Sequence, residues 1–324
     1  MSAECAVCYV ADLNFLLPSL VSAAGLRQFV PAHKADIFIF LVDGNEARIR
    51  ECNQFLQPHG IRILAMNSSS YSGFDRDKFH KSGVPTATLG RFFIDDLLPD
   101  ACQRIVYIDG DTWMWRDPSA LIEAVVPDGK FAAAEDMTSF RCSNILPRGR
   151  ALRPYFKNLG LNPKDGYFNA GIFATSRNTW KALASEAFEF FRKNTAICKY
   201  HDQSALNAVM GDRRLHLSLK WNFQTPYRFM GIEKSVKPRI YHFHSQPKPW
   251  MGASAPWQEM YSLYQAALAP FDALNLPIKK ADAATIAAHN KLNWRKNLLL
   301  KSPLVAKIAS LHTGIHAYES KTWL

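Results

Sequence analysis

The chain has 324 residues, of which 48% are hydrophobic, and a formal net charge of +11. This length and composition predict a globular protein with one large domain, or one domain and an appendage. The longest uncharged stretch of the early helices, residues 13–26, contains polar residues and a proline and falls short of the ~20 residues that span a bilayer. The first residues carry no positively charged signal, so the sequence favours a cytoplasmic protein over a secreted one.

Apolar runs alternate with segments of helical period along most of the chain. Strands are predicted at residues 6–11, 37–42, 61–65, 104–108, 131–134, 167–174 and 239–244, and helices at 16–29, 46–56, 88–98, 177–192 and 201–210. This alternation predicts an α/β fold with a mostly parallel sheet covered by helices. A Pro-, Gly- and Arg-rich loop is predicted at 137–166, and a boundary near Met251 divides an α/β domain at 1–250 from a helical, basic C-terminal segment at 251–324.

The six cysteines indicate reduced thiols rather than a zinc site. The one Cys-x-x-Cys pair, Cys5 and Cys8, lies in the first predicted strand, where residues three apart point to opposite faces. Because no second pair completes a four-ligand site, we expect all six thiols to be mostly buried.

Two carboxylates, one residue apart, follow the predicted strand at 104–108. Asp109 and Asp111 would offer oxygen ligands to a hard divalent cation at a strand end, where open α/β sheets place their ligands. Gly110 between them would let the backbone turn closely beneath the ion. Acidic pairs also occur in ordinary turns, because aspartate hydrogen-bonds its own backbone there, so the pair alone leaves both interpretations open.

Four other segments accompany the acidic turn. They are Asp12-Leu13-Asn14-Phe15 at a strand end, Phe168-Asn169-Ala170-Gly171, His201-Asp202-Gln203 at a helix start, and the stretch from His242 to Trp250. In order and rough spacing the five segments resemble glycosyltransferase family 8, the retaining, nucleotide-sugar-dependent transferases, over residues 5–250. The resemblance implies a GT-A type, Rossmann-like nucleotide-binding domain.

The resemblance also implies a metal-bound donor. Asp109, Asp111 and His242 would hold Mn²⁺, or Mg²⁺, and the diphosphate oxygens of a UDP-sugar would complete an octahedron. Mixed oxygen and nitrogen ligands favour manganese. His244 shares a strand face with His242 but has no counterpart in the family, so we interpret it as a hydrogen-bonded structural histidine.

The family pattern further assigns a donor pocket. Its residues are Val10, Ala11, Asp12, Asn14, Phe15, Arg91, Gly110, Asp136, Asn169, Ala170, Gly171, Ser245 and Lys248. Asp12 would accept the uracil N3–H, cap the following helix, or do both. Lys248, which stands between two prolines, would stabilise the departing β-phosphate. Family members often have Tyr at the position of Phe15 and Gly at that of Ser245, so donor contacts at these two positions are expected to differ.

Asp202, Gln203 and Lys248 are the catalytic candidates, the first two through sugar hydroxyls near the anomeric carbon. We expect a retaining, metal-dependent hexosyltransferase that moves galactose or glucose from a UDP-sugar to a glycan or glycolipid, such as lipopolysaccharide or capsule. Because Gln203 is a weak nucleophile, same-face attack by the acceptor hydroxyl is favoured over a covalent intermediate.

Two alternatives come from other classes of protein. A haloacid-dehalogenase-like phosphatase would use an Asp-x-Asp-x-Thr strand, but Thr112 stands one position too early. A non-catalytic RNA- or lipid-binding protein would depend on the positive charge.

Two basic segments suggest partners. Between Lys279 and Leu324, eight Lys and Arg residues face two acidic ones and are interleaved with leucines and Trp294. This pattern suits a peripheral position on the inner face of an anionic membrane better than nucleic acid, and the alternative is a tail packed on the domain. Between 137 and 166, six Lys and Arg residues face Asp165 alone, which fits a solvated loop or one that binds an acidic glycan.

Overall fold

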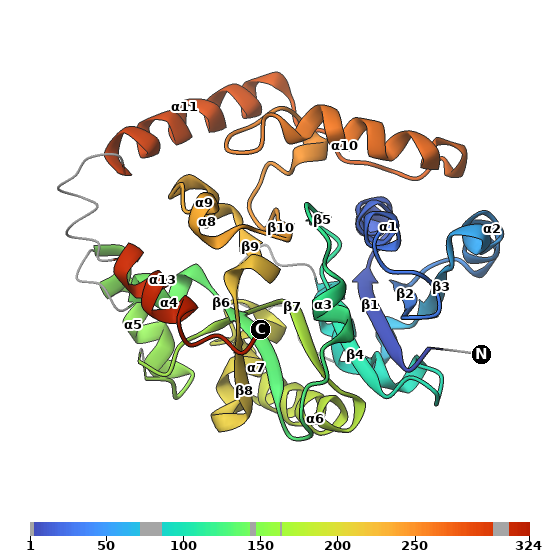
Figure 1. Cartoon of the computed structure of the whole chain (residues 1–324), viewed down its shortest axis with the longest axis horizontal. Coiled ribbons are helices and arrows are strands. Elements are labelled where there is room, and N and C mark those ends of the chain that lie inside the picture. The colour runs from blue at the N-terminus through green and yellow to red at the C-terminus, as the bar shows by residue number, and fades with distance from the viewer. Residues whose placement is uncertain (1–2, 72–85, 143–146, 163, 301–310) are drawn as a thin grey trace.

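The computed structural model describes residues 3–71, 86–142, 147–162, 164–300 and 311–324, with the backbone alone at 70, 147–148, 294–300 and 311. At its centre is a seven-stranded sheet in the order β3-β2-β1-β4-β7-β6-β8 (Figure 1). The strands are β1 (Cys5–Ala11), β2 (Asp36–Val42), β3 (Ile61–Met66), β4 (Arg104–Ile108), β6 (Phe131–Glu135), β7 (Phe168–Ser176) and β8 (Arg214–Leu217). All neighbours pair in parallel except β7, which is antiparallel to β4 and to β6. The predicted α/β fold with a mostly parallel sheet is confirmed.

A second sheet of three short strands joins distant parts of the sequence. Its order is β5 (Thr112–Met114), β10 (Ile240–His242) and β9 (Phe223–Gln224). Strand β10 is antiparallel to β5, with His242 opposite Thr112. This register places His242 beside the acidic turn that precedes β5. The strand is shorter than the predicted 239–244.

Helices cover both faces of the central sheet. They are α1 (Leu13–Arg27), α2 (Glu46–Leu56), α3 (Ser119–Glu123), α4 (Met137–Cys142), α5 (Pro147–Asn158), α6 (Arg177–Lys193), α7 (His201–Val209), α8 (Thr225–Phe229), α9 (Glu233–Val236), α10 (Met260–Leu268), α11 (Ala283–Leu300) and α13 (Leu311–Glu319). The 3₁₀ helices are η1 (Gln57–His59), η2 (Ser68–Tyr71), η4 (Thr86–Phe93), η5 (Asp95–Leu97), η6 (Gly211–Arg213), η7 (Leu219–Trp221), η8 (Pro249–Met251) and η9 (Ala269–Leu274). The predicted helix at 88–98 therefore consists of the 3₁₀ helices η4 and η5.

The predicted loop at 137–166 is wrong over much of its length, because α4 and α5 occupy it. Pro147 stands at the first position of α5, where proline sacrifices no hydrogen bond, and the helix continues past Pro154. The arginines of this segment are good helix formers, so its composition fits a helix as well as a loop. Residues 143–146 and 163 lie outside the described residues.

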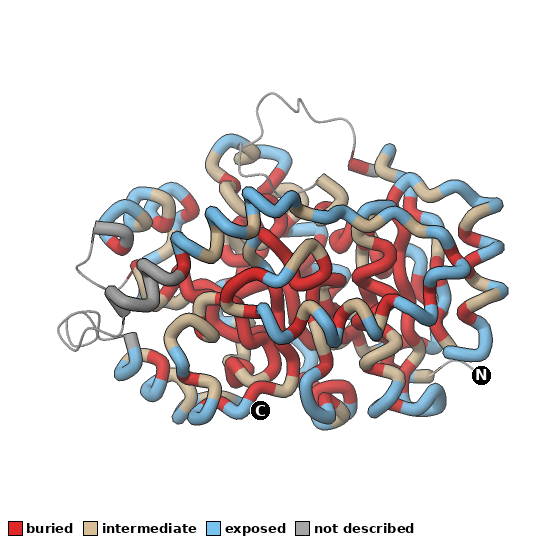
Figure 2. The backbone as a smooth tube through the Cα atoms, turned by 90° about the horizontal axis from the view of Figure 1, so that it is seen from above, coloured by how far each residue is buried: buried red, intermediate tan, exposed pale blue. Residues whose placement is uncertain are grey.

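Alternate residues of the central strands face two hydrophobic cores. Val7 and Tyr9 of β1 join the core beneath α1 and α2, whereas Ala6 and Cys8 join the core beneath α6 and α7. Strands buried on both faces explain why the sequence shows continuous apolar runs rather than alternation. The interior strands form the buried centre of the molecule in Figure 2. All six cysteines are free and buried, as expected.

The C-terminal segment crosses the top of the molecule and returns to the sheet (Figure 1). After α10 and α11, helix α13 packs beside β8, where Ile315 is buried and the Tyr318 hydroxyl donates to the carbonyl of Leu217. The Leu324 carbonyl accepts from the Ser218 N–H at 3.1 Å and from Trp221 Nε1 at 3.0 Å. The last residues of the chain therefore contribute to the core. No helix among the described residues is long and apolar enough to cross a membrane.

Candidate functional site

A cleft of about 500 Å³ opens at the carboxyl ends of β1 and β4. It is lined by Val10, Ala11, Asp12, Phe15, Ala87, Thr88, Arg91, Tyr107, Asp109, Gly110, Asp111, Asp136, Met137, Thr138, Arg141, Asn169, Gly171, Tyr200, Asp202, Gln203, Pro226, His242, His244, Gln246 and Lys248. The fold thus brings together all but three of the residues that the sequence predicted for the site.

The three exceptions are Asn14, Ala170 and Ser245. Asn14 is exposed in the first turn of α1. Ala170 points to the opposite face of β7 from its neighbours Asn169 and Gly171, because side chains alternate along a strand, and it is buried in the core. Ser245 is not among the lining residues, although the next residue, Gln246, is.

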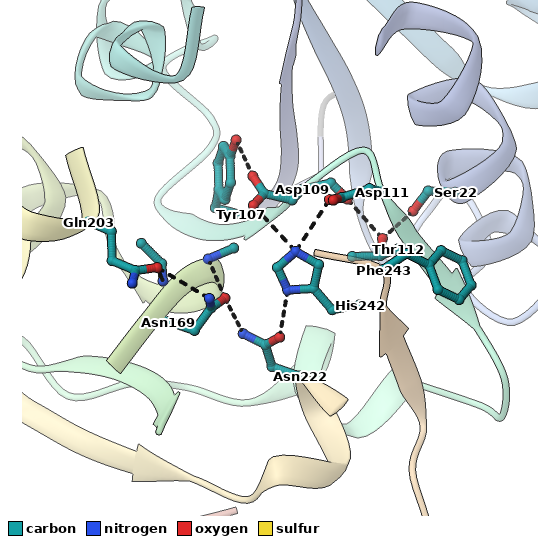
Figure 3. A network of polar contacts seen from close by, with 12 residues as sticks. Ser22, Tyr107, Asp109, Asp111, Thr112, Asn169, Gln203, Asn222, His242 and Phe243 are labelled. Carbon is teal, nitrogen blue, oxygen red and sulfur yellow. Dashed lines mark hydrogen bonds and ion pairs between the residues drawn. The ribbon is translucent and has the colours of Figure 1, made fainter. Parts of the chain in front are cut away.

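Asp109 stands immediately after β4 and is held by two donors. The Tyr107 hydroxyl donates to its Oδ1 at 2.9 Å (Figure 3). The Arg91 guanidinium donates to the same oxygen at 3.0 Å. Burial raises the pKa of the Asp109 carboxyl above its usual range, and Arg91 offsets this only in part. The second oxygen, Oδ2, lies on the side of His242.

The two carboxylate oxygens of Asp111 likewise face different partners. Its Oδ2 accepts a hydrogen bond from the Lys248 ammonium, while its Oδ1 lies 3.3 Å from His242 Nε2. Burial alone would raise the pKa of Asp111, but Lys248 and His242 outweigh it and hold the pKa well below its usual range. Asp111, a predicted metal ligand, and Lys248, predicted to act on the β-phosphate, are therefore in direct contact.

Three potential ligand atoms converge at this point. Within the described part of the chain, Asp109, Asp111 and His242 form a cluster whose ligand atoms all lie within 4.8 Å of one another. His242 Nε2 is 3.3 Å from Asp111 Oδ1 and 3.8 Å from Asp109 Oδ2. Adjacent ligands on octahedral bonds of about 2.1 Å lie about 3 Å apart, so a slight contraction fits this donor set to one divalent cation.

Two glycines make room for the cluster. A Cβ on Gly171 would lie 2.4 Å from His242 Cε1 and 2.6 Å from Asp109 Oδ2, so the absence of a side chain lets β7 approach the cluster closely. A Cβ on Gly110 would lie 2.1 Å from the Ser19 hydroxyl of α1. Gly110 therefore lets α1 pack closely against the acidic turn, and its φ is not left-handed.

Asp202 and Gln203 start helix α7 on the opposite wall. Asp202 is buried and pairs with Arg91 at 3.0 Å. Gln203 Oε1 accepts hydrogen bonds from the Ala170 N–H at 3.1 Å and from Asn169 Nδ2 at 3.2 Å. The amide oxygen of Gln203 is thus turned toward the protein.

Asp12 caps α1, as one of the two expected roles requires. Its Oδ1 accepts from the N–H groups of Asn14, at 2.9 Å, and Phe15, at 3.0 Å. The ring of Phe15 meets that of Trp250 edge-on, and Trp250 is buried against Tyr264.

Sequence reasoning missed several residues of the site. His244 is exposed and lines the cleft beside His242, with the two ring centroids 5.7 Å apart, so it belongs to the cleft although the sequence analysis left it out of the site. Tyr107 and Tyr200 look like core aromatics in the sequence. Asn222, a lone amide between Trp221 and Phe223, carries no motif, yet it contacts His242 (Figure 3).

Comparison with known proteins agrees with this geometry. The family model "Glycosyl transferase family 8" matches residues 6–253. The chain is 26% identical to General stress protein A of Bacillus subtilis (strain 168) over 255 residues, which cover 71% of this chain and 82% of that protein. Glycosyltransferase GlyE of Streptococcus pneumoniae serotype 4 (strain ATCC BAA-334 / TIGR4) is 23% identical over 175 residues, 50% of this chain and 37% of GlyE.

Solved structures share the fold. The galactosyltransferase LgtC, in complex with donor and acceptor sugar analogs, superposes with a TM-score of 0.65 at 17% identity, covering 90% of this chain and 99% of LgtC. The apo form of GlyE superposes with a TM-score of 0.57 at 18% identity, covering 87% of this chain and 66% of that structure.

A mostly parallel sheet with an acidic cluster at its strand ends defines a GT-A glycosyltransferase fold. The chain belongs to glycosyltransferase family 8, whose model spans most of its length.

Proposed function

We propose that this glycosyltransferase moves galactose or glucose from a UDP-sugar to a glycan acceptor with retention at the anomeric carbon, and that it requires Mn²⁺ or Mg²⁺. The cluster of Asp109, Asp111 and His242 in the cleft carries the proposal. These residues would hold the cation, which when bound neutralises the diphosphate and so makes UDP a better leaving group.

The charge of the cleft supports a cation. The lining includes five carboxylates and three cationic side chains, Arg91, Arg141 and Lys248. Arg91 and Lys248 are already paired with aspartates. A diphosphate would meet net negative charge in such a lining, and a divalent ion cancels that charge.

Retention by same-face attack agrees with the contacts of α7. The Gln203 oxygen accepts two hydrogen bonds from β7, and Asp202 is paired with Arg91. Neither group is free to act as a strong nucleophile. We therefore assign Asp202 and Gln203 to positioning of the donor sugar, and Lys248 to the leaving phosphate.

The alternatives receive no support. Thr112, which a phosphatase of the haloacid dehalogenase type would need near its substrate, is fully buried and bonded to Ser22 and to the Asp109 carbonyl. The family assignment disfavours a non-catalytic RNA- or lipid-binding protein.

Thermal-shift measurements with nucleotide sugars test the donor. UDP-galactose and UDP-glucose should raise the Tm only when Mn²⁺ or Mg²⁺ is present, because the proposed site binds the diphosphate through the cation. A ligand at 100 times its Kd adds about 2.7 kcal/mol to the free energy of unfolding. GDP- and ADP-sugars are the matched controls. A shift without metal, or an equal shift with every nucleotide sugar, would contradict the proposal.

The change Asp111→Ala tests the metal. It removes one ligand and leaves Lys248 without its carboxylate, so we expect transfer to fall about 10³-fold, or ~4 kcal/mol of transition-state stabilisation. UDP-sugar hydrolysis should fall with it. Near-normal turnover of the variant at limiting Mn²⁺ would rule out this ligand set.

The acceptor remains the least constrained substrate. Arg141 lines the cleft, and Arg150, Arg153 and Lys157 are exposed on the adjoining α5, while the side chain of Arg148 lies outside the described residues. We propose that these cations bind an acidic glycan. Exchange of Arg150 and Arg153 for glutamate should then raise the acceptor KM and leave UDP-sugar hydrolysis unchanged.

Attachment of the C-terminal segment to an anionic membrane stays a prediction. Lys279, Lys280 and Lys291 are exposed, but the side chains of 294–300 and all of 301–310 lie outside the described residues. Sedimentation of the full chain with anionic liposomes at low salt tests it, with neutral liposomes as the control.

A further inference from the structure

Asn222 lies between η7 and β9 and is fully buried. Its amide touches His242 on one side and Asn169 on the other (Figure 3). We propose that Asn222 is a positioning residue that fixes His242 as the Nδ1–H tautomer, so that Nε2 presents its lone pair to Asp109 and Asp111. The inference rests on the proposed metal site, and it extends that site to a residue outside the cleft lining.

A backbone N–H fixes the orientation of the Asn169 amide. The N–H of Gly171 lies 3.0 Å from the Asn169 side chain, and since an N–H can only donate, the atom that it meets is the amide oxygen of Asn169. The amide nitrogen of Asn169 then faces oxygens on its other side, Asp136 Oδ2 at 3.0 Å and Gln203 Oε1 at 3.2 Å. Three contacts agree on the orientation of this amide.

The orientation of Asn169 determines that of Asn222. The Asn169 oxygen lies 2.9 Å from the Asn222 side chain, so Asn222 must present its NH₂ group there. Its oxygen consequently faces His242 Nδ1, at 2.9 Å. A flipped Asn222 would oppose its own oxygen to that of Asn169 at this distance. The nitrogen Nδ1 of His242 must therefore carry the proton.

The competing tautomer is chemically plausible, which makes the assignment testable. A neutral His242 with its proton on Nε2 could donate to Asp111 Oδ1, but that distance is 3.3 Å, longer than the 2.9 Å to Asn222. It would also place the Nδ1 lone pair against the oxygen of Asn222. Free histidine in water prefers the Nε2–H form, so the chain of Asn169 and Asn222 reverses an intrinsic preference. Metal ligation by Nε2 requires that reversal.

Asn222 is itself held in place by the backbone. Its N–H donates to the Leu219 carbonyl at 3.1 Å, which closes η7, and its neighbours Trp221 and Phe223 are buried in the core. An amide fixed in this way orients the imidazole ring in advance, as the hydrogen-bond partners of metal-bound histidines generally do.

Nitrogen-15 NMR of the metal-free wild-type protein tests the tautomer without any activity measurement. Protein labelled at histidine is examined at a pH of about 9, where histidine side chains are ordinarily neutral. The signals of His242 are identified by their loss in His242→Gln. Its Nδ1 should have the shift of a protonated nitrogen and its Nε2 that of an unprotonated one. The opposite assignment would overturn the proposal.

Variants of Asn222 test the consequence. Asn222→Leu should convert His242 wholly or partly to the Nε2–H form and weaken Mn²⁺ binding, measured by calorimetry in the presence of UDP, about 10- to 100-fold. Asn222→Asp keeps an acceptor for Nδ1–H and should keep the tautomer, but its second oxygen opposes that of Asn169, so its Mn²⁺ affinity should lie between those of Asn222→Leu and the wild type. Asn53→Ala is the matched control, because it also removes an amide that makes two hydrogen bonds, in this case to the backbone of Ile63 and outside the cleft lining, and should leave Mn²⁺ binding unchanged.

The two proposals fail in different ways. If the wild type binds no Mn²⁺ with UDP, the proposed metal site is wrong, whatever the tautomer. If the wild type binds Mn²⁺ but Asn222→Leu, when folded, keeps the Nδ1–H form and its affinity within twofold, the role of Asn222 is wrong and the metal site stands. If Asn222→Leu does not fold, the wild-type spectrum still decides.

Discussion

Gly171 shows how closely the backbone of β7 approaches the ligand cluster. Its missing side chain leaves space that His242 and Asp109 fill on the same side of the strand. Both neighbours are constrained, His242 by Asn222 and Asp109 by Tyr107 and Arg91. The clash of a new methyl group with these side chains therefore cannot be relieved by movement of a flexible side chain.

We expect Gly171→Ala to weaken Mn²⁺ binding at least tenfold and to lower the free energy of unfolding by about 1–3 kcal/mol, as overpacking of a dense site does. Calorimetry and urea unfolding measure the two effects. Gly25→Ala is the control, because a Cβ there would meet Met114 at an ordinary 3.6 Å. Equal metal affinities in the two variants would show that the cluster adapts.

At the scale of single residues, the sequence predicted the candidate metal ligands better than the residues that position those ligands. Asp109, Asp111 and His242 stand in motifs with characteristic spacing, and the structure brings them together. Asn222 has no such pattern, because its partners His242 and Asn169 are 20 and 53 residues away in the sequence. Only the pairing of β10 with β5 and β9 shows that it supports the cluster.

Helix α1 begins at a residue with two possible tasks. Asp12 lines the cleft, and its Oδ1 satisfies two N–H groups of the first turn. A cap of this kind contributes about 1 kcal/mol. The structural and ligand-binding contributions of Asp12 can be separated, because asparagine also caps helices well.

The prediction for α1 compares two substitutions. Asp12→Asn should keep the Tm close to that of the wild type but raise the Kd for UDP about tenfold, because it replaces one carboxylate oxygen by a donor. Asp12→Ala should lose both the helix cap and the UDP contact, so its free energy of unfolding should be lower by about 1 kcal/mol and its Kd for UDP should also be higher. Thermal unfolding and UDP titration measure these effects. If Asp12→Asn binds UDP as well as the wild type, Asp12 is a cap alone.

At the scale of elements, prediction succeeded where burial leaves a strong pattern. Strands β1, β2 and β4 are buried on both faces, so their apolar runs are unmistakable. The short strands β5, β8 and β9 contain two to four residues and depend on pairing with distant segments. No local pattern marks them. The prolines and glycines of 137–166 suggested a loop, but the segment contains α4 and α5. The effect of proline depends on its position within a helix, which composition alone does not give.

At the scale of the whole molecule, the C-terminal residues join strands β6 and β8 through hydrogen bonds. Tyr318 accepts from the Glu135 N–H at 3.0 Å and donates to Leu217, which links α13 to both β6 and β8. Glu319 accepts from the Ser218 hydroxyl at 2.7 Å and from the Leu219 N–H at 2.8 Å. These contacts lie just before η7, the element that leads to Asn222.

Removal of residues 311–324 should therefore lower the free energy of unfolding by at least about 2 kcal/mol, from the burial of Ile315 and the lost hydrogen bonds. Thermal and urea unfolding test this expectation. Lys321→Ala, a change at an exposed residue of the same segment, is the control and should have no effect. An unchanged Tm after truncation would show that the segment is an appendage.

Buried tyrosines make the free energy of unfolding of the molecule depend on pH. Burial raises the pKa of ten of them, namely Tyr9, Tyr71, Tyr107, Tyr155, Tyr167, Tyr200, Tyr227, Tyr241, Tyr264 and Tyr318. In the unfolded chain these hydroxyls lose their protons near the ordinary value of about 10. Above that pH the unfolded state binds fewer protons than the folded state, so the free energy of unfolding falls as pH rises.

We therefore expect stability to be independent of these tyrosines below about pH 9 and to fall steeply above about pH 10. Tyrosinate absorbance should rise together with the loss of the far-UV circular dichroism signal, because the buried hydroxyls ionise only when the chain unfolds. The same protein in concentrated urea is the control and should titrate near pH 10. Most of the tyrosinate absorbance appearing near pH 10 while the secondary structure persists would contradict the burial of these side chains.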